Sequence, residues 1–122
     1  MDISTIHQRL ENCPNNIYSA ALDAIEKKIQ HDLAKRAIEK AKAAVIIAKG
    51  NEAKNQSVLN AYVIMDKGVD EAEAKAIQAN ADYLMAEVLR EKEQNVFDAV
   101  KKECNMLEAE MRNFGGRSQS NQ

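Results

Sequence analysis

The chain has 122 residues, of which 45% are hydrophobic, 30% are charged and only 4% are aromatic. Its formal net charge is −2, so any surface for nucleic acid has to be concentrated in one part of the sequence. The length fits one domain and no stretch alternates with the two-residue period of a strand. The sequence therefore predicts an all-α protein.

Targeting and redox features are sparse. No apolar run reaches the roughly 18 residues of a membrane span, and the N-terminus lacks the order of a signal peptide. Cys13 and Cys104 lie far apart, without a C-x-x-C pair or a neighbouring histidine. We therefore expect a soluble, cytoplasmic protein with two reduced thiols and with no disulfide, metal site or cofactor.

Residues 1–14 are predicted to form a short amphipathic segment, with Ile3, Ile6 and Leu10 at helical spacing. The run Pro14-Asn15-Asn16 should end that segment, and an asparagine there could cap the next helix. A single helical domain is then expected over residues 15–114.

The domain should begin with a basic helix over residues 16–49. Its expected packing face consists of large aliphatic residues, namely Leu22, Ile25, Ile29, Leu33 and Ile47. Four lysines also recur every seven residues, and each step rotates the side chain by only about 20° around the helix. They form one continuous basic row, made of Lys28, Lys35, Lys42 and Lys49, with His31 near it.

A connecting helix is predicted over residues 52–67. Gly50 and Asn51 precede it as a helix stop or a hinge, and Gly68 should end it in the left-handed conformation. The sequence leaves open whether this stretch is a separate helix or an irregular extension of its neighbours.

A long acidic helix is predicted over residues 69–114. Its apolar residues recur with the 3–4 spacing of a coiled-coil seam, which is interrupted only by Arg90 and Glu93. The seam consists of Val69, Ala72, Ala76, Ala79, Tyr83, Ala86, Arg90, Glu93, Phe97, Val100, Cys104, Leu107, Met111 and Phe114. A second row contains Ile77, Ala81, Leu84 and Val88. The first half of this helix should therefore meet two neighbours.

Both ends of the acidic helix carry sequence signals. Asp70 and Glu73 have the spacing of a capping box at its start. At the other end, Gly115 and Gly116 should terminate the helix, which leaves residues 115–122 as a disordered polar tail.

Charge is distributed unevenly along the chain. From Lys27 to Lys54 there are eight basic and three acidic residues, whereas from Asp66 to Glu110 there are twelve acidic and six basic ones. Two interpretations are open. The basic helix could pair with the acidic helix within or between subunits, or it could offer a face to a polyanion such as a phosphate backbone.

No set of residues predicts catalysis. The sequence contains no Ser/His/Asp or Cys/His arrangement and no Gly-rich phosphate loop. The acidic residues of the long helix are most simply a solvated face. We therefore expect a protein that is not an enzyme and has no catalytic residues.

Three segments carry a resemblance to a known family: A-I-E-K-A-K-A-A-V-I-I-A-K-G at 37–50, N-E-A-K-N-Q-S at 51–57 and L-E-A-E-M-R-N-F-G-G at 107–116. Their order, a basic helix ending in a glycine turn, a polar stretch and a long C-terminal helix, resembles the small bacteriophage recombination mediators of the UvsY-like group. The resemblance covers roughly residues 17–116. It rests on this organisation.

The resemblance implies a ring-shaped homo-oligomer that binds single-stranded DNA and helps to load a RecA-like recombinase onto DNA covered by single-strand binding protein. It implies DNA contacts for Lys35, Arg36, Lys40, Lys42, Lys49 and Lys54, and the basic row adds Lys28. It implies assembly through Phe97, Val100, Leu107, Met111 and Phe114, to which the seam adds Cys104. A phage-encoded protein of this kind would act in the cytoplasm of the bacterial host.

The predicted fold is thus an elongated, all-α hairpin or bundle of two long helices with a short intervening helix, which assembles through its C-terminal coiled-coil helix. The first functional hypothesis is a non-enzymatic, single-stranded-DNA-binding recombination mediator. The alternative is a phage-encoded helical adaptor or inhibitor that binds a host enzyme with its acidic helix, residues 70–110. A purely structural coiled-coil subunit is the third.

Overall fold

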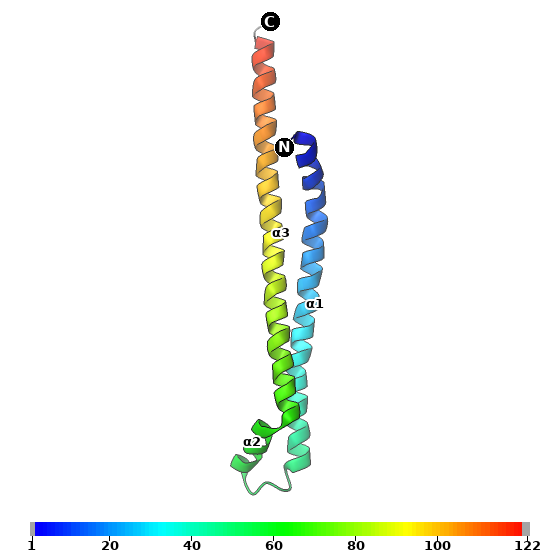
Figure 1. Ribbon diagram of the computed structural model, residues 1–122, viewed down its shortest axis with the longest axis vertical. Coiled ribbons are helices and arrows are strands. Elements are labelled where there is room, and N and C mark those ends of the chain that lie inside the picture. The colour runs from blue at the N-terminus through cyan, green and yellow to red at the C-terminus, as the bar shows by residue number, and fades with distance from the viewer. Residues whose placement is uncertain (1, 121–122) are drawn as a thin grey trace. The chain divides into compact units, whose positions relative to one another are not determined.

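The structure is a computed structural model that describes the backbone of residues 2–120 and the side chains of residues 2–114. Over this range it contains three helices and no strand: α1 (Ile3–Lys49), α2 (Gln56–Met65) and α3 (Lys67–Ser120) (Figure 1). The two long helices pack against each other and α2 is the short helix between them, which confirms the predicted all-α class. None of the described helices is both long and apolar enough to span a membrane.

The N-terminal helix starts earlier than predicted. The Asp2 carboxylate accepts a hydrogen bond from the Thr5 backbone N–H at 2.8 Å and caps α1, which then runs through Pro14 without a break. The helix break expected at Pro14-Asn15-Asn16 is therefore wrong. Pro14 removes one helical hydrogen bond, but Ile6 and Cys13 are buried within the same unit and hold the helix in place.

The short helix has different caps from those predicted. It begins at Gln56 instead of residue 52, because the Asn55 side chain accepts a hydrogen bond from the Val58 N–H at 3.0 Å. Asp66 ends it in an extended conformation, and its carboxylate then accepts a hydrogen bond from the Val69 N–H at 3.0 Å. Gly68 lies inside α3 and is not left-handed. Asp66 therefore ends α2 in place of Gly68 and caps the start of α3 in place of Asp70.

The bounds of α3 extend to Ser120, past the stop predicted at Gly115 and Gly116. Glycine can adopt helical dihedral angles, so two glycines do not by themselves end a helix. The side chains of the tail predicted over residues 115–122 lie outside the described residues, as does the backbone of residues 121–122.

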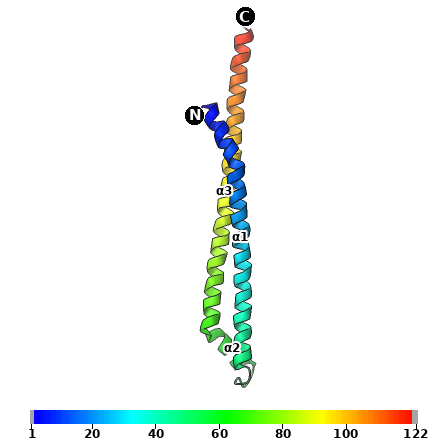
Figure 2. The same cartoon turned by 90° about the vertical axis from the view of Figure 1, so that its right-hand side faces the viewer.

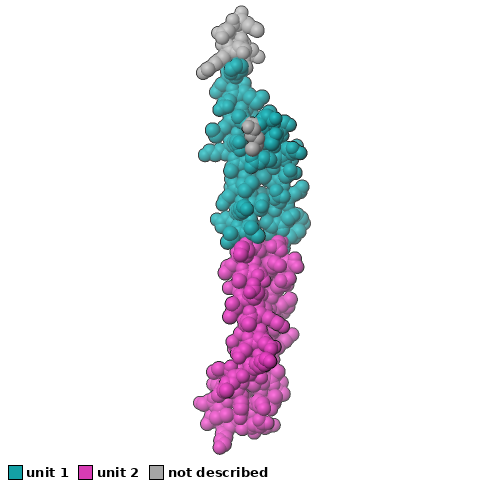
Figure 3. All heavy atoms as spheres, viewed as in Figure 1, with its two compact units in different colours: residues 1–22, 87–122 teal, residues 23–86 magenta. Residues whose placement is uncertain are grey.

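The chain divides into two compact units, where the sequence predicts a single domain over residues 15–114 (Figure 3). Unit 1 contains residues 1–22 and 87–122. Its core is formed by Ile6, Cys13, Val100 and Cys104, and partly buried Ile3, Leu10, Val96, Phe97 and Leu107 pack against this core. Two ion pairs join its helices, His7 with Glu108 at 3.3 Å and Arg9 with Glu103 at 3.9 Å.

Unit 2 contains residues 23–86, so it includes the end of α1, all of α2 and the start of α3. Its buried residues are Ala24, Val45, Val69, Ala72, Ala76 and Ala86. The short helix lies beside the adjoining ends of the long helices and has no fully buried residue (Figure 2). Alanine at four of these six positions lets α1 and α3 approach closely, but each alanine removes little apolar area from water.

On α3 the buried positions follow the predicted seam from Val69 to Leu107. At the two polar positions of the seam, Arg90 is exposed and lies 3.6 Å from Glu87, whereas Glu93 is half-buried. Residues Ile77, Leu84 and Val88 of the second row are exposed by 54% or more, so no second neighbour covers them among the described residues.

On α1 the predicted packing face is on the outside. Leu22, Ile25, Ile29, Leu33 and Ile47 are between 48% and 82% exposed. The buried or half-buried residues follow a different 3–4 repeat: Ile3, Ile6, Leu10, Cys13, Ile17, Ala20, Ala24, Lys27, His31, Ala34, Ile38, Ala41 and Val45. Within unit 2 this repeat contains Ala24, Ala34 and Ala41, whose small side chains permit the close helix contact that the alanine-rich seam of α3 requires.

Candidate nucleic-acid interface

The basic row lies along one edge of α1 in unit 2. Lys28, Lys35 and Lys42 each directly follow a seam residue, so they flank the contact with α3 instead of pointing away from it. Neighbouring lysines of the row are about 10.5 Å apart along the helix axis, because seven residues each rise about 1.5 Å. The row therefore presents evenly spaced cations, which suits a phosphate backbone and carries no base-specific information.

The other three predicted DNA-contacting residues do not join this row. Arg36 is rotated by about 100° from Lys35, and Lys40 by about 160° from Lys42, so both point toward other faces of α1. Lys54 lies in the segment between α1 and α2. The structure thus brings four of the seven predicted residues onto one edge and separates the other three from it.

Most of the predicted cations are available to a ligand. Lys28, Lys35, Arg36, Lys40 and Lys54 are exposed, and none of them has an ion-pair partner among the side chains that the structure describes.

The last two cations of the row have local partners. Lys42 lies 3.9 Å from Glu39, and Lys49 lies 3.4 Å from Glu52 and 5.9 Å from the ring centre of Tyr62. Exposed pairs of this kind contribute only about 0 to 1 kcal/mol, so a phosphate could displace the carboxylates.

Within unit 2 the basic helix does not pair with the acidic helix. Across residues 23–86, all of which the structure describes, the ion pairs fall within α1 or between α1 and the segment that follows it. The ion pairs between α1 and α3 involve His7 and Arg9 in unit 1, outside the basic row. Pairing with α3 inside the chain therefore does not account for the basic row.

Two grooves adjoin the row. One, of about 480 Å³, is lined by His31, Lys35, Ile38, Glu73, Ala76, Ile77 and Asn80. The other, of about 390 Å³, is lined by Lys42, Ile46, Asn60, Val63, Ile64, Val69 and Glu73. Glu73 borders both grooves, so one carboxylate reduces the positive potential near Lys35 and Lys42.

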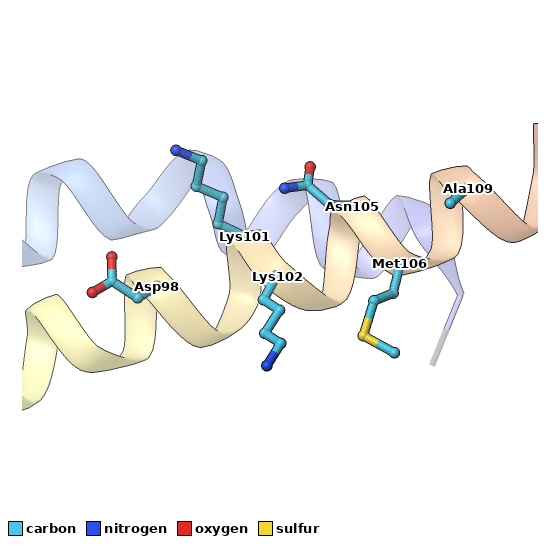
Figure 4. Close-up of a pocket in the computed structure, with 6 residues that line it drawn as sticks. All are labelled: Asp98, Lys101, Lys102, Asn105, Met106 and Ala109. Atoms are coloured by element: carbon cyan, nitrogen blue, oxygen red, sulfur yellow. The ribbon is translucent and has the colours of Figure 1, made fainter.

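A further hollow in unit 1 is not a comparable anion site. It is lined by α3 alone, through Asp98, Lys101, Lys102, Asn105, Met106 and Ala109 (Figure 4). Lys101 and Lys102 point to opposite sides of the helix in this view, and Asp98 lies one turn before Lys102. The two lysines therefore do not converge on one ligand.

The predicted assembly residues are largely used within the chain. Val100 and Cys104 are 1% and 4% exposed in the core of unit 1, and Phe97 and Leu107 pack against that core. Their partners are apolar residues at the start of α1, a stretch that the sequence predicts as a separate segment. Met111 and Phe114 are 58% and 76% exposed, so for these two a contact with another copy stays a prediction.

One cluster of potential ligands was missed from the sequence. In unit 1, His7, Cys104 and Glu108 come together, and the thiol of Cys104 donates a hydrogen bond to Glu108. Burial raises the pKa of this thiol, and the nearby Glu108 charge raises it further. The spacing of Cys104 and Glu108, four residues apart on a helix, was the only available signal, because His7 lies 101 positions from Glu108.

No family model, characterised protein or solved structure matches this chain. Its function is therefore inferred from side-chain geometry and charge.

Proposed function

We propose that this protein is a non-enzymatic, homo-oligomeric protein that binds single-stranded DNA through the basic row of α1. One observation carries the proposal: the lysines of the row lie on one edge of a helix, and α3 supplies no ion-pair partner for them across residues 23–86. Evenly spaced cations on one edge of a helix suit binding to a phosphate backbone, and the carboxylates beside Lys42 and Lys49 form only weak, exposed pairs with them.

The surroundings of the row favour backbone contact over base recognition. Ile38 and Val45 lie close to the row and belong to the contact with α3, so the lysine stems can rest on apolar surface while their ammonium groups reach solvent. The ring of Tyr62 lies 5.9 Å from Lys49 Nζ and is 37% exposed, and the ring of His31 near the row is stacked on Tyr83. Stacking on bases is therefore secondary to charge in this proposal.

Self-association would supply the affinity that one short row lacks. Large apolar residues remain exposed on the outer sides of both long helices in unit 2, including Ile25, Ile29 and Leu33 on α1 and Ile77 and Leu84 on α3. Two such rows on one chain would allow each copy to contact two others. Several basic rows held in one assembly then act together through their effective concentration.

The biological role that we propose is that of a recombination mediator. The resemblance to the UvsY-like group supports this role, because those proteins bind single-stranded DNA and help to load a RecA-like recombinase onto DNA covered by single-strand binding protein. An assembly that holds the strand through its phosphates leaves the bases accessible to a recombinase.

The test is a titration of fluorescent single-stranded DNA with the purified protein at several salt concentrations, with the molar mass measured on the same sample. Four phosphate contacts per chain predict a slope of about −2.8 for log affinity against log salt, or about a 50-fold loss between 50 and 200 mM. The variant Lys35→Glu/Lys42→Glu should lose most binding and at least half of this slope. The matched control is Lys101→Glu/Lys102→Glu, which makes the same charge change on exposed lysines of α3.

If both double variants lost the same affinity for single-stranded DNA, the loss would come from net charge alone, and the basic row would not be the binding site. An assembled protein that does not bind DNA at low salt would refute the proposal as a whole.

A second candidate is a protein adaptor that uses α3. It is favoured by two apolar residues of unit 1, Val88 and Leu89, which are 62% and 46% exposed and lie in the sequence between Glu87 and Glu91. Apolar residues flanked by carboxylates suit binding to a groove on another protein that is lined by basic residues. Under this alternative, Glu87→Lys/Glu91→Lys removes activity, whereas Lys35→Glu/Lys42→Glu leaves it unchanged.

A further inference from the structure

A cluster of three different metal-binding groups lies in unit 1, apart from the basic row. His7 projects from α1, and Cys104 and Glu108 project from the same face of α3, four residues apart. The imidazole, thiol and carboxylate each offer one ligand atom, and these atoms all lie within 4.8 Å of one another. Nitrogen, sulfur and oxygen ligands are the ones that Zn²⁺ takes in proteins.

The distances between these ligand atoms agree with a shared tetrahedral ion. His7 Nε2 lies 3.3 Å from Glu108 Oε1, and Cys104 Sγ lies 3.6 Å from the same oxygen. Bond lengths to zinc of about 2.0 to 2.3 Å at tetrahedral angles place nitrogen and oxygen ligands about 3.4 Å apart, and sulfur and oxygen ligands about 3.6 Å apart. These two spacings match those of a zinc site, and the ligand atoms of His7 and Cys104 lie within 4.8 Å of each other.

The cluster is also built like a site. Cys104 is 4% exposed and belongs to the apolar core of the unit with Ile6 and Val100, which fixes the position of the sulfur. The side chains of His7 and Glu108 are 50% and 48% exposed, so the site opens to solvent on their side. Because Cys104 is buried while His7 and Glu108 face solvent, water can occupy the fourth coordination position, as in zinc sites with three protein ligands.

We propose that His7, Cys104 and Glu108 bind one Zn²⁺ ion per chain and thereby cross-link α1 to α3 within unit 1. On binding, the S–H bond of Cys104 breaks, the thiolate sulfur bonds to the metal and the proton passes to the buffer. The ion replaces the contact between His7 and Glu108 and the hydrogen bond between Cys104 and Glu108. Thiolate ligation selects zinc over the hard cations Mg²⁺ and Ca²⁺.

Co²⁺ is a suitable probe because, unlike zinc, it is coloured. The reduced full-length protein is titrated with Co²⁺, and Zn²⁺ is then added to displace it. The expected result is one equivalent of cobalt per chain, with tetrahedral d–d bands and a thiolate-to-cobalt charge-transfer band that zinc abolishes. The zinc-loaded protein should also unfold at a higher temperature than the metal-free protein, since the ion binds the folded state.

Variants separate this site from adventitious binding. Cys104→Ser and His7→Gln should each weaken binding about 100-fold or more, because even the loss of an outer-shell partner costs about 10- to 100-fold. The matched control is Cys13→Ser, which removes the other buried thiol of the same core but no proposed ligand. Its affinity should stay within about twofold of the parent.

His7→Gln keeps the test decisive if Cys104→Ser fails to fold, because His7 is half exposed and its loss leaves the core intact. Absence of the charge-transfer band from the parent protein would overturn the proposal. So would loss of the band in Cys13→Ser, or unchanged cobalt affinity in a folded His7→Gln protein. None of these measurements depends on nucleic acid.

Discussion

The imidazole of His31 stacks on the ring of Tyr83, with ring centroids 6.3 Å apart and planes inclined by 12°. Both residues lie on the 3–4 repeats that α1 and α3 turn toward each other in unit 2. The neighbouring seam positions on α3, Ala79 and Ala86, are small, so the stacked pair fills a layer between alanine layers. His31 is thus a packing residue beside the basic row and not part of it.

A double-mutant cycle should detect this pair. Stacked aromatic rings contribute about 0.5 to 1.5 kcal/mol beyond their buried area, so His31→Leu and Tyr83→Leu should be less than additive by that amount in the free energy of unfolding. Tyr18→Leu is the control, because Tyr18 is 66% exposed and its loss should change stability by less than about 0.5 kcal/mol. Strict additivity of the first two variants would show that the stack is not formed.

How far the fold could be predicted differs between the two long helices. On α3 one apolar repeat runs the length of the helix, and residues Val69 to Leu107 of it face α1 as predicted. On α1 two apolar repeats compete, and the one with the larger side chains, Ile25, Ile29 and Leu33, is on the outside. Side-chain size alone could not choose between them, because the alanines of α3 favour close approach over large side chains.

The two candidate sites also differ in how far the sequence could predict them. The basic row depends only on a seven-residue period within one helix, so the positions of its four lysines relative to one another followed from the sequence. The cluster of His7, Cys104 and Glu108 depends on the register between two helices joined by a long connection, and no single-helix period contains that information. The same register explains why Val100 and Cys104 are buried within the chain.

Matched alanine substitutions on α1 test which face is the core. Ile6 is fully buried, and Ile6→Ala should cost about 2 to 5 kcal/mol of unfolding free energy. Ile25 is 56% exposed, so Ile25→Ala should cost less than about 1 kcal/mol. Both values are measured by urea denaturation at a protein concentration where the chain is monomeric. If Ile25→Ala cost more unfolding free energy than Ile6→Ala, the face of α1 that contains Ile25 would be the core face, as the sequence predicts.

The cap at the start of α3 gives a further prediction. The Asp66 carboxylate accepts the Val69 N–H, so Asp66→Ala should lower the unfolding free energy by about 1 kcal/mol. Asp70 lies within the first turn of α3, so Asp70→Ala loses only an interaction with the helix dipole, worth about 0.3 to 0.5 kcal/mol. If Asp70→Ala were the more costly variant in thermal unfolding, the capping box predicted with Glu73 would be correct after all.

Glu73 should act against nucleic-acid binding, because it borders the grooves that contain Lys35 and Lys42. Glu73→Gln removes a negative charge beside the row and should raise the affinity for single-stranded DNA about two- to fivefold at low salt. Glu71→Gln is the matched control: Glu71 is exposed and lines neither groove, so its effect should be smaller. The difference between the two variants should shrink as salt screens the charges. The measurement is a fluorescence titration with both variants at two salt concentrations, and equal gains would mean that only net charge matters and that the DNA does not follow the basic row.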